Sequence, residues 1–515
     1  MAKRLWMLLA VCTGLAGLTG CPKQQAQAPV PQPDQAHMAM QGEITVFVPC
    51  GIAGPYGETK KLFEQRYPNI KVKHELANID VQARLLAEGK AQPDVWLCLG
   101  DREMERVQQA GNVDGQPVTY AYNSVAMLVQ KGNPRKIESL QDLTRPEIKT
   151  IALATPENSN GYYGEQALRK SGVWDQVEKK LWRTAEPVKL KEQLLAGKAD
   201  AAMVYYPCTR ETHIVAGRPQ EVPGKLQLLG KIPTELSGPI PAQAAVIKGA
   251  KNPEAGRAFL AILTEAAVQD AWEKFAFDRA VADPNRISMY MYCGAGIRPM
   301  MDPAVEAFRQ IKPNVRIDVG YAGSGCLLGQ LAFSRRGDLY VPGEDFYINQ
   351  AQKRGYLTES KPVGCFEPVI LVQKGNPKGI KALADLTRSG LKIGLGEPGA
   401  CAVGVAAERL LKKANLHEAV LKNVIYRAGN VPELGNAVKF GSIDAAIVWN
   451  LTAAQLTKDC EAVLIDRSLY EPATVPVAVL KYTEHPAEAR AFVDFLTGPE
   501  GQKIVTASGM TAATK

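Results

Sequence analysis

The sequence predicts an α/β protein made of two tandem copies of one module. Two observations lead to this prediction. The chain contains a long internal repeat, and within each copy short β-branched runs alternate with amphipathic stretches, a pattern typical of parallel strands joined by crossover helices. The length agrees, because 515 residues exceed what one hydrophobic core usually supports. We expect a secretory signal at 1–20, a flexible tether at 21–42, module 1 at 43–285 and module 2 at 286–515.

The N-terminus has the residue order of a signal peptide. Lys3 and Arg4 precede an apolar run, which closes on small residues before Cys21. The segment Leu-Thr-Gly-Cys ending at Cys21 resembles a bacterial lipobox, and the resemblance implies cleavage before Cys21 and acylation of its thiol. An uncleaved membrane helix is the alternative, although the apolar run barely spans a bilayer. We therefore expect a lipid-anchored protein of the cell envelope that faces the periplasm or the extracellular side.

The tether prediction rests on composition. Residues 22–41 are rich in Gln, Pro and Ala and lack the aromatic and branched residues that build a core. The folded part is therefore expected to begin near Glu43.

The repeat sets the domain organisation. Residues 128–134 return unchanged at 371–377, an offset of 243, and the same offset links 142–145 to 385–388 and Cys50-Gly51 to Cys293-Gly294. Residues 200–202 match 444–446 at an offset of 244, whereas 257–259 match 490–492 at 233. Module 1 should therefore carry extra residues after Cys208. The period is far too long for a solenoid unit, so each copy is a domain or a domain pair.

Both modules are expected to begin β-α-β-α-β. The expected strands of module 2 are 287–292, 315–319 and 338–341, with a turn at 293–296 and helices at 303–311 and 327–333; those of module 1 are 44–48, 70–73 and 94–97. Loops after parallel strands meet at the carboxyl edge of the sheet, where helix N-termini present N–H groups. This edge is a ready site for a small anion. The acidic residues after the third strand (Asp101, Glu103, Glu344 and Asp345) are expected to be solvated helix starts.

Module 2 resembles the type II solute-binding proteins of ABC importers, and within them the molybdate-binding branch. The resemblance rests on Tyr-Cys-Gly-Ala-Gly-Ile-Arg-Pro at 292–299, Gly-Ser-Gly at 323–325, Lys-Gly-Asn-Pro at 374–377, Gly-Glu-Pro-Gly at 396–399 and Asp-Ala-Ala-Ile-Val-Trp at 444–449. The C-terminal segment 475–501 also matches the family pattern. Module 1 keeps several of these segments but has Asn-Ile-Asp at 78–80 in place of the Gly-Ser-Gly loop.

The resemblance implies a fold, a ligand and a partner. Each module would have two α/β lobes joined by a hinge around a central cleft. The ligand would be a small oxyanion such as molybdate or tungstate, the partner the membrane subunits of an ABC importer, and no cofactor would be needed.

Carried over position by position, the resemblance also implies ligand-binding residues in each cleft. In module 2 they are Gly294, Ala295, Ser324, Ala402, Val431 and Trp449. The neighbouring Cys293, Gly325, Cys326 and Cys401 are further candidates from this sequence, although Cys293 and Cys326 lie where the family usually has small or hydroxyl residues. In module 1 they are Cys50, Gly51, Asn78, Ser159, Val188 and Tyr205. The family uses a tyrosine hydroxyl at the last position, which Tyr205 keeps and Trp449 replaces with an indole N–H. Ser324 has a second interpretation, an ordinary helix cap.

Cysteine usage does not fit a plain oxyanion binder. Eight cysteines lie outside the signal and the anchor: Cys50, Cys98, Cys208, Cys293, Cys326, Cys365, Cys401 and Cys460. One interpretation is disulfides, with Cys50–Cys98 and Cys293–Cys326 as natural pairs in an oxidising compartment. A second is that the trio Cys50, Cys98 and Cys208, or its counterpart in module 2, captures a soft metal ion or a thiophilic ligand. A third is buried free cysteine.

Other function classes find less support. The formal net charge is +8, but the basic residues are spread without a basic run or interleaved aromatic residues, which argues against a nucleic-acid partner. None of the five histidines pairs with a repeated Ser or Cys, and no common catalytic motif is present, so we expect no enzymatic activity. A ligand sensor or scaffold that delivers no cargo stays open as an alternative to transport.

Overall fold

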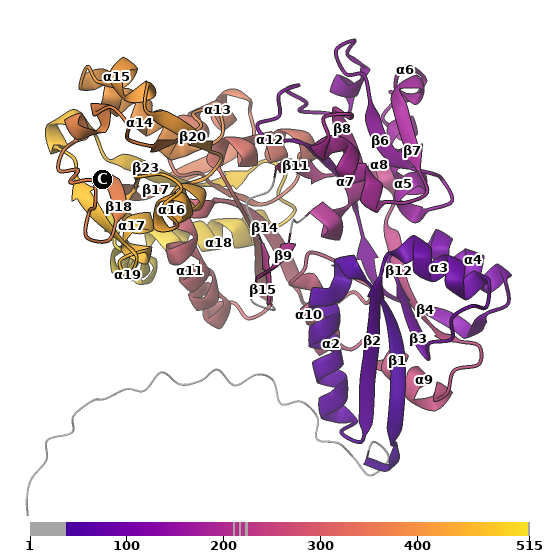
Figure 1. Ribbon diagram of the computed structural model, residues 1–515. Coiled ribbons are helices and arrows are strands. Elements are labelled where there is room, and N and C mark those ends of the chain that lie inside the picture. Colours follow the sequence, from indigo (N-terminus) through magenta and orange to yellow (C-terminus); the bar gives the residue numbers. More distant parts are fainter. Residues whose placement is uncertain (1–37, 210–211, 216–217, 222–224, 513–515) are drawn as a thin grey trace, which may run out of the picture.

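The computed structural model describes residues 38–209, 212–215, 218–221 and 225–512. The predicted signal, the anchor residue Cys21 and most of the predicted tether lie outside these residues. The chain forms two tandem modules, each with two α/β lobes, so the predicted fold class is confirmed (Figure 1). We name the lobes 1A, 1B, 2A and 2B in the order in which the chain enters them.

Module 1 is built on two sheets. Lobe 1A has six strands in the order β13-β4-β12-β3-β1-β2, and lobe 1B has five in the order β11-β5-β8-β6-β7. The strands of lobe 1A are β1 (Gly42–Pro49), β2 (Ile70–Ala77), β3 (Val95–Cys98), β4 (Val113–Asn123), β12 (Ile240–Ile247) and β13 (Asp278–Arg279), and its helices are α2 (Ala53–Arg66), α3 (Ile79–Ala87), α4 (Asp101–Gln109), α9 (Pro253–Ile262) and α10 (Ala266–Glu273). The strands of lobe 1B are β5 (Val125–Gln130), β6 (Ile151–Ala154), β7 (Leu181–Thr184), β8 (Ala201–Tyr205) and β11 (Leu226–Lys231), and its helices are α5 (Ser159–Lys170), α6 (Trp174–Val177), α7 (Val188–Leu195) and α8 (Thr234–Ser237).

Module 2 repeats this plan. Lobe 2A has the order β15-β14-β16-β23-β17-β24, and lobe 2B has the order β20-β19-β21-β18-β22. The strands of lobe 2A are β14 (Ile287–Gly294), β15 (Val315–Ala322), β16 (Leu339–Val341), β17 (Leu357–Phe366), β23 (Ala473–Leu480) and β24 (Thr511–Ala512), and its helices are α11 (Arg298–Ile311), α12 (Ser324–Ser334), α13 (Asp345–Lys353), α18 (Pro486–Thr497) and α19 (Pro499–Ala507). The strands of lobe 2B are β18 (Pro368–Gln373), β19 (Ile393–Gly396), β20 (Val424–Ala428), β21 (Ala445–Trp449) and β22 (Cys460–Leu464), and its helices are α14 (Ala402–Lys413), α15 (His417–Leu421), α16 (Val431–Lys439) and α17 (Asn450–Gln455).

The predicted β-α-β-α-β openings are present in both modules. The first three strands of each module are parallel, so their carboxyl ends meet at one edge that faces the other lobe. Two details differ from prediction. β14 runs to Gly294, so Cys293 lies on a strand rather than in a turn, and α11 starts at Arg298, ahead of Pro303.

The repeated Gly-Asn-Pro segment has a local structural cause. Asn133 and Asn376 both adopt positive φ, 46° and 44°, a conformation that asparagine tolerates better than most residues. Each side chain also bonds to the backbone four residues on, Asn133 to Ile137 and Asn376 to Ile380. The turn therefore needs the same residue in both copies.

The offset between the modules is not 243 everywhere. β1 corresponds to β14, α2 to α11 and β2 to β15, pairs of equal length offset by 245. Cys50 is therefore the counterpart of Ala295, and the predicted match of Cys50-Gly51 to Cys293-Gly294 is wrong, because the register of the strands places the cysteines two residues apart.

The predicted extra residues after Cys208 form a hairpin. β9 (Thr212–Val215) and β10 (Arg218–Glu221) pair antiparallel in a separate two-stranded sheet.

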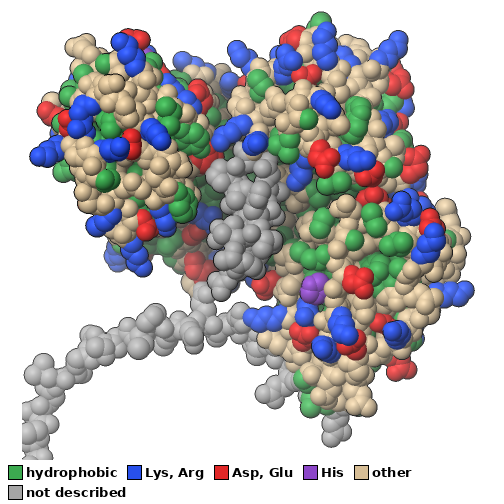
Figure 2. All heavy atoms as spheres, viewed as in Figure 1, with side chains coloured by type: hydrophobic (Ala, Val, Ile, Leu, Met, Phe, Trp, Pro, Cys, Tyr) green, Lys and Arg blue, Asp and Glu red, His purple; other side chains and the backbone are tan. Residues whose placement is uncertain are grey.

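No helix among the described residues is long and apolar enough to cross a membrane. Figure 2 shows acidic and basic side chains interspersed on the visible face, without a single-sign patch.

The two modules pack against each other. Helix α12 of lobe 2A lies along β11, the edge strand of lobe 1B (Figure 1). Phe333 from α12 joins the hydrophobic core of module 1, and Gln330 donates a hydrogen bond to the carbonyl of Leu228 at 3.3 Å. Lys131 of lobe 1B forms an ion pair of 2.8 Å with Glu433 of lobe 2B. Lobe 1B therefore touches both lobes of module 2.

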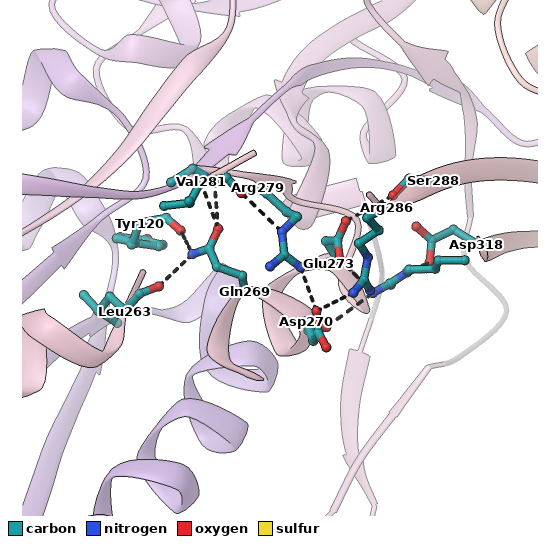
Figure 3. Close-up of polar contacts among 12 residues, drawn as sticks. Tyr120, Leu263, Gln269, Asp270, Glu273, Arg279, Val281, Arg286, Ser288 and Asp318 are labelled. Atoms are coloured by element: carbon teal, nitrogen blue, oxygen red, sulfur yellow. Dashed lines mark hydrogen bonds and ion pairs between the residues drawn. The ribbon is translucent and has the colours of Figure 1, made fainter. Parts of the chain in front are cut away.

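An ionic network joins lobes 1A and 2A at the junction (Figure 3). The Glu273 carboxylate, at the end of α10, lies within 3.4 Å of three guanidinium groups, those of Arg279, Arg286 and Arg316. Its side chain is only 7% exposed, and Ser288 donates to it at 3.3 Å. Arg316 and Ser288 belong to module 2, so this carboxylate lies at a contact between the modules.

Candidate functional site

A small cavity lies between lobes 2A and 2B. The centre of a water molecule can move within about 10 Å³ of this cavity, so the cavity has room for one water molecule or one compact ion. The lining residues are Gly294, Ala295, Gly296, Ile297, Ala322, Gly323, Ser324, Gly343, Phe366, Cys401, Ala402, Asn430, Val431 and Trp449. None of these residues carries a formal charge. The cavity therefore offers dipoles and hydrogen-bond donors rather than counter-ions.

Three helices begin at the cavity wall. Ser324 is the first residue of α12, Ala402 of α14 and Val431 of α16. The first N–H groups of an α-helix have no acceptor within the helix, and the helix dipole places partial positive charge there. Three N-termini directed at one cavity favour an anion.

Two side chains add donors. The Ser324 hydroxyl oxygen accepts from the N–H of Gly343 at 2.9 Å, which leaves its proton free to be donated into the cavity. Because α12 starts at Ser324 and its N-cap is Gly323, the interpretation of Ser324 as a helix cap is wrong. The Trp449 ring is buried and stacked on Phe366, with centroids 5.3 Å apart. This stacking fixes the edge that carries the indole N–H.

The lobes of module 2 are closed around the cavity. The N–H of Gly325 donates to the carbonyl of Ala400 at 2.9 Å, and the Tyr347 hydroxyl donates to the carbonyl of Pro398 at 2.8 Å. A Cβ atom on Gly325 would lie 2.0 Å from the Gly399 oxygen, and one on Gly323 would lie 2.0 Å from the Gly429 oxygen. Glycine is therefore required on both sides of Ser324 for this closed arrangement.

The structure gathers most of the residues predicted for module 2. Seven of them line the cavity: Gly294, Ala295, Ser324, Cys401, Ala402, Val431 and Trp449. Cys293, Gly325 and Cys326 do not line it. Cys293 is buried in the strand before the cavity, whereas Gly325 packs against the other lobe.

Sequence reasoning missed several lining residues. Gly296, Gly323 and Asn430 adjoin predicted positions, so a wider window around each loop would have included them. Gly343 follows β16 and lies in none of the sequence motifs on which the family resemblance rests. A Cβ atom on Gly343 would lie 3.2 Å from Ala402, 3.6 Å from the Ser324 hydroxyl and 3.8 Å from the Trp449 indole nitrogen, so its missing side chain leaves the cavity open.

The residues predicted for module 1 lie mostly apart from one another. Val188 is 42% exposed on the surface, and Cys50 is exposed with its sulfur 3.7 Å from the Asn78 oxygen. Gly51 packs towards Cys208, whose sulfur would lie 3.0 Å from an added Cβ atom. The predicted ligand-binding set of module 1 is therefore dispersed, apart from Ser159 and Tyr205.

Ser159 and Tyr205 come together around a carboxylate of the protein itself. Glu103, from α4 of lobe 1A, is fully buried and accepts a hydrogen bond from the Ser159 N–H at 3.1 Å, from the Ser159 hydroxyl at 2.5 Å and from the Tyr205 hydroxyl at 3.3 Å. The expectation that Glu103 and Glu344 are solvated helix starts is wrong, because both follow the third strand at the interlobe face and are buried there.

A cavity of about 610 Å³ lies between lobes 1A and 1B of module 1. Asn78, Asp80 and Arg84 of the α3 region line one side, and Thr155, Asn158 and Glu186 of lobe 1B line the other. Asn78 thus faces a polar, mixed-charge space, separate from the Ser159 and Tyr205 pair.

All eight cysteines are free thiols, so the disulfide interpretation is wrong. Cys98 is buried with its sulfur 2.9 Å from the Gly100 oxygen, whereas Cys50 is exposed beside Asn78. No group of three or more His, Cys, Asp or Glu side chains in the described ranges could hold a metal ion, which overturns the proposed trio of Cys50, Cys98 and Cys208.

Thiol ionisation also disfavours soft-metal capture. Burial raises the pKa of Cys326 and of Cys208 to about 11, and that of Cys401 to about 12. Metal ligation and nucleophilic attack need the thiolate, which is scarce at neutral pH at these pKa values. Cys401 therefore contributes a neutral wall to the cavity.

Glu344 is a buried acid beside the cavity wall. One carboxylate oxygen accepts from Arg409 of lobe 2B, and the other has no protein partner. Burial raises the pKa of Glu344 to about 7, an effect that the positive charge of Arg409 opposes.

We expect this acid to make the stability of the protein pH-dependent. The folded-state pKa exceeds the unfolded value of 4.5, so the Glu344 contribution is fully present below pH 4.5 and is lost as the pH rises to about 7. The free energy of unfolding should fall by up to about 3 kcal/mol across this window. Denaturant titrations from pH 4 to pH 8 should show a shallower slope for Glu344→Gln, whereas Glu418→Gln, at an 89% exposed side chain, should keep the wild-type slope. An unchanged slope in Glu344→Gln would contradict the assignment.

Both halves of the chain are similar to known proteins. The family model for bacterial extracellular solute-binding proteins matches residues 44–278 and again 289–511. The molybdate-binding protein ModA of Mycobacterium tuberculosis is 27% identical over 223 residues, which cover 43% of this chain and 84% of ModA.

Solved structures also match. The periplasmic molybdate-binding protein of Azotobacter vinelandii is 15% identical with a TM-score of 0.39, covering 44% of this chain and all of its own. The sulfate-binding protein SubI of Mycobacterium tuberculosis is 20% identical with a TM-score of 0.40, covering 44% of this chain and 88% of its own.

Proposed function

Because this chain belongs to the family of bacterial extracellular solute-binding proteins, we propose that its module 2 captures a small oxyanion of the molybdate type and delivers it to the membrane subunits of an ABC importer. The protein acts outside the cytoplasm and is a binding protein rather than an enzyme. We also propose acylation of Cys21 as its attachment to the membrane, and 43–285 and 286–515 as the bounds of the modules.

The uncharged cavity of module 2 carries this proposal. A tetrahedral dianion needs many donors, and three helix N-termini, the Ser324 hydroxyl and the Trp449 indole N–H supply them. A basic side chain would pay a desolvation cost of its own before it could help, which neutral dipoles avoid. The small size of the cavity favours a compact anion over a sugar or an amino acid.

The proposed ligand class can be tested by calorimetry on the mature chain. We expect molybdate or tungstate to bind at one anion per chain and to raise the Tm, because a ligand that binds only the folded state stabilises it by mass action. Sulfate and phosphate are the competing arms. Ser324→Ala, which removes a donor from the cavity wall, should weaken binding on the order of tenfold, equivalent to about 1.4 kcal/mol.

Its matched control is Ser468→Ala, at an exposed serine that lies before β23 and does not line the cavity. Tight binding of sulfate or phosphate with no response to molybdate would change the ligand within the same site. No response to any oxyanion would contradict the proposed function.

A further inference from the structure

Module 1 holds a buried carboxylate, that of Glu103, between its two lobes. This carboxylate accepts three hydrogen bonds, all from lobe 1B, and none of the described Lys or Arg residues forms an ion pair with it. Burial raises the pKa of the Glu103 carboxyl, and the hydrogen bonds from Ser159 oppose this rise by favouring the ionised form. Burying such a charge costs free energy, which the donors and the N-terminus of α5 must offset.

The two residues that donate to this carboxylate correspond to residues that line the anion cavity of module 2. Ser159 is the first residue of the 12-residue helix α5, as Ala402 is of the 12-residue helix α14. Tyr205 ends the five-residue strand β8, as Trp449 ends the five-residue strand β21. Ala402 and Trp449 line the cavity of module 2, whereas their counterparts hold Glu103.

The chain around Glu103 is shaped for this contact. Gly100, just before α4, lies so close to lobe 1B that an added Cβ atom would be 2.1 Å from the Ser159 hydroxyl and 3.0 Å from the Tyr205 hydroxyl. The Arg102 N–H donates to the Ser159 hydroxyl oxygen at 2.9 Å, and the Tyr163 hydroxyl donates to Asp101 at 2.7 Å. The first turn of α4 thus closes the two lobes of module 1 on each other.

Module 2 differs at the equivalent positions. Helices α4 and α13 both have nine residues, so Glu103 corresponds to Tyr347 and Leu99 to Gly343. Tyr347 turns to the Pro398 carbonyl and Gly343 leaves space, whereas Leu99 is a buried hydrophobic side chain. Glu103 and Leu99 therefore fill space in module 1 that their counterparts Tyr347 and Gly343 leave free in module 2.

We propose that the Glu103 carboxylate is the built-in anion of module 1. It occupies the anion position from within, keeps module 1 closed without solute, and leaves module 2 as the oxyanion-binding half of the chain. Module 1 then acts as a rigid body against which module 2 closes, through α12 and the Lys131–Glu433 ion pair. If Glu103 is replaced by alanine, a small carboxylate such as formate or acetate should bind where the side-chain carboxylate was.

The test is chemical rescue in the full chain. Glu103→Ala should lower the Tm of module 1 by about 5 °C, because the Ser159 and Tyr205 donors lose their buried acceptor. Millimolar formate or acetate should restore most of this loss, whereas chloride at equal ionic strength should not. Glu105→Ala, at an exposed residue of the same helix, is the matched control and should show neither the loss nor the rescue.

A second variant covers the case in which Glu103→Ala does not fold. Glu103→Gln keeps the shape of the side chain but turns an amide N–H towards donors, so hydrogen exchange at residues 159–162 should speed up at least tenfold. Wild-type Tm and exchange in both variants would overturn the proposal, and so would a Glu103→Ala loss that no carboxylate restores. The rescue needs no ligand in module 2, so rescue without any oxyanion binding would leave the assignment of Glu103 as the built-in anion of module 1 standing and would remove the proposed function of module 2, on which only the role given to module 2 here rests.

Discussion

Replacing Gly325 with alanine should weaken oxyanion binding on the order of 100-fold, equivalent to about 2.7 kcal/mol. The new Cβ atom would lie 2.0 Å from the Gly399 oxygen and 2.9 Å from the Ala400 Cα atom, both backbone atoms of the opposite lobe. These atoms cannot move aside as the end of a flexible side chain could. Lobes 2A and 2B would stay apart, and the donors of α12 and α14 would no longer reach one anion together.

The same substitution should not unfold the protein. Alanine is a better helix former than glycine, by up to about 1 kcal/mol, and position 325 lies within α12. The matched control is Gly329→Ala in the same helix, where an added Cβ atom meets nothing within 4 Å. Calorimetric Kd values together with Tm values separate the two effects. Wild-type affinity in Gly325→Ala would show that the closed arrangement of module 2 is not the binding state.

Replacing Glu273 with alanine should lower the free energy of unfolding by about 2–3 kcal/mol. This carboxylate is 7% exposed and lies among the guanidinium groups of Arg279, Arg286 and Arg316. Its removal leaves Asp270 as the carboxylate partner of Arg279 and Arg286, and Asp318 as that of Arg316. The loss should fall on the contact between lobes 1A and 2A, since Arg316 and Ser288 come from module 2.

Denaturant unfolding of the full chain measures this effect. Glu500→Ala is the control, because Glu500 pairs with Lys503 on the surface with both side chains about 70% exposed, and such pairs contribute about 1 kcal/mol or less. If Glu273→Ala lowered the free energy of unfolding no more than Glu500→Ala does, the network would not stabilise the contact between the modules.

Much of the fold could be predicted from the sequence. The repeat at 128–134 and 371–377 identified two modules, and the alternation of strands and helices placed the first three strands of each within a few residues. These predictions hold because they depend on local periodicity and on turn residues such as Asn133 and Asn376, whose backbone conformation is set within a few residues.

The candidate site was predictable only in part. Ser324, Ala402, Val431 and Trp449 line the cavity, as the family resemblance implied, because helix starts after parallel strands must meet at one sheet edge. Cys293, Gly325 and Cys326 were predicted with them but do not line it. Sequence adjacency to a loop does not determine which way a side chain points.

The sequence by itself determined that the chain is a tandem binding protein, because the repeat and the order of family motifs are properties of the linear chain. Only the tertiary structure decided that the two clefts are unequal. Glu103 follows a strand at the start of a helix, where the sequence predicts a solvated acid, yet its donors come from Ser159 and Tyr205, which lie 56 and 102 residues further along the chain. Whether an acid is solvated or buried depends on what the opposite lobe brings to it. No local pattern contains that information.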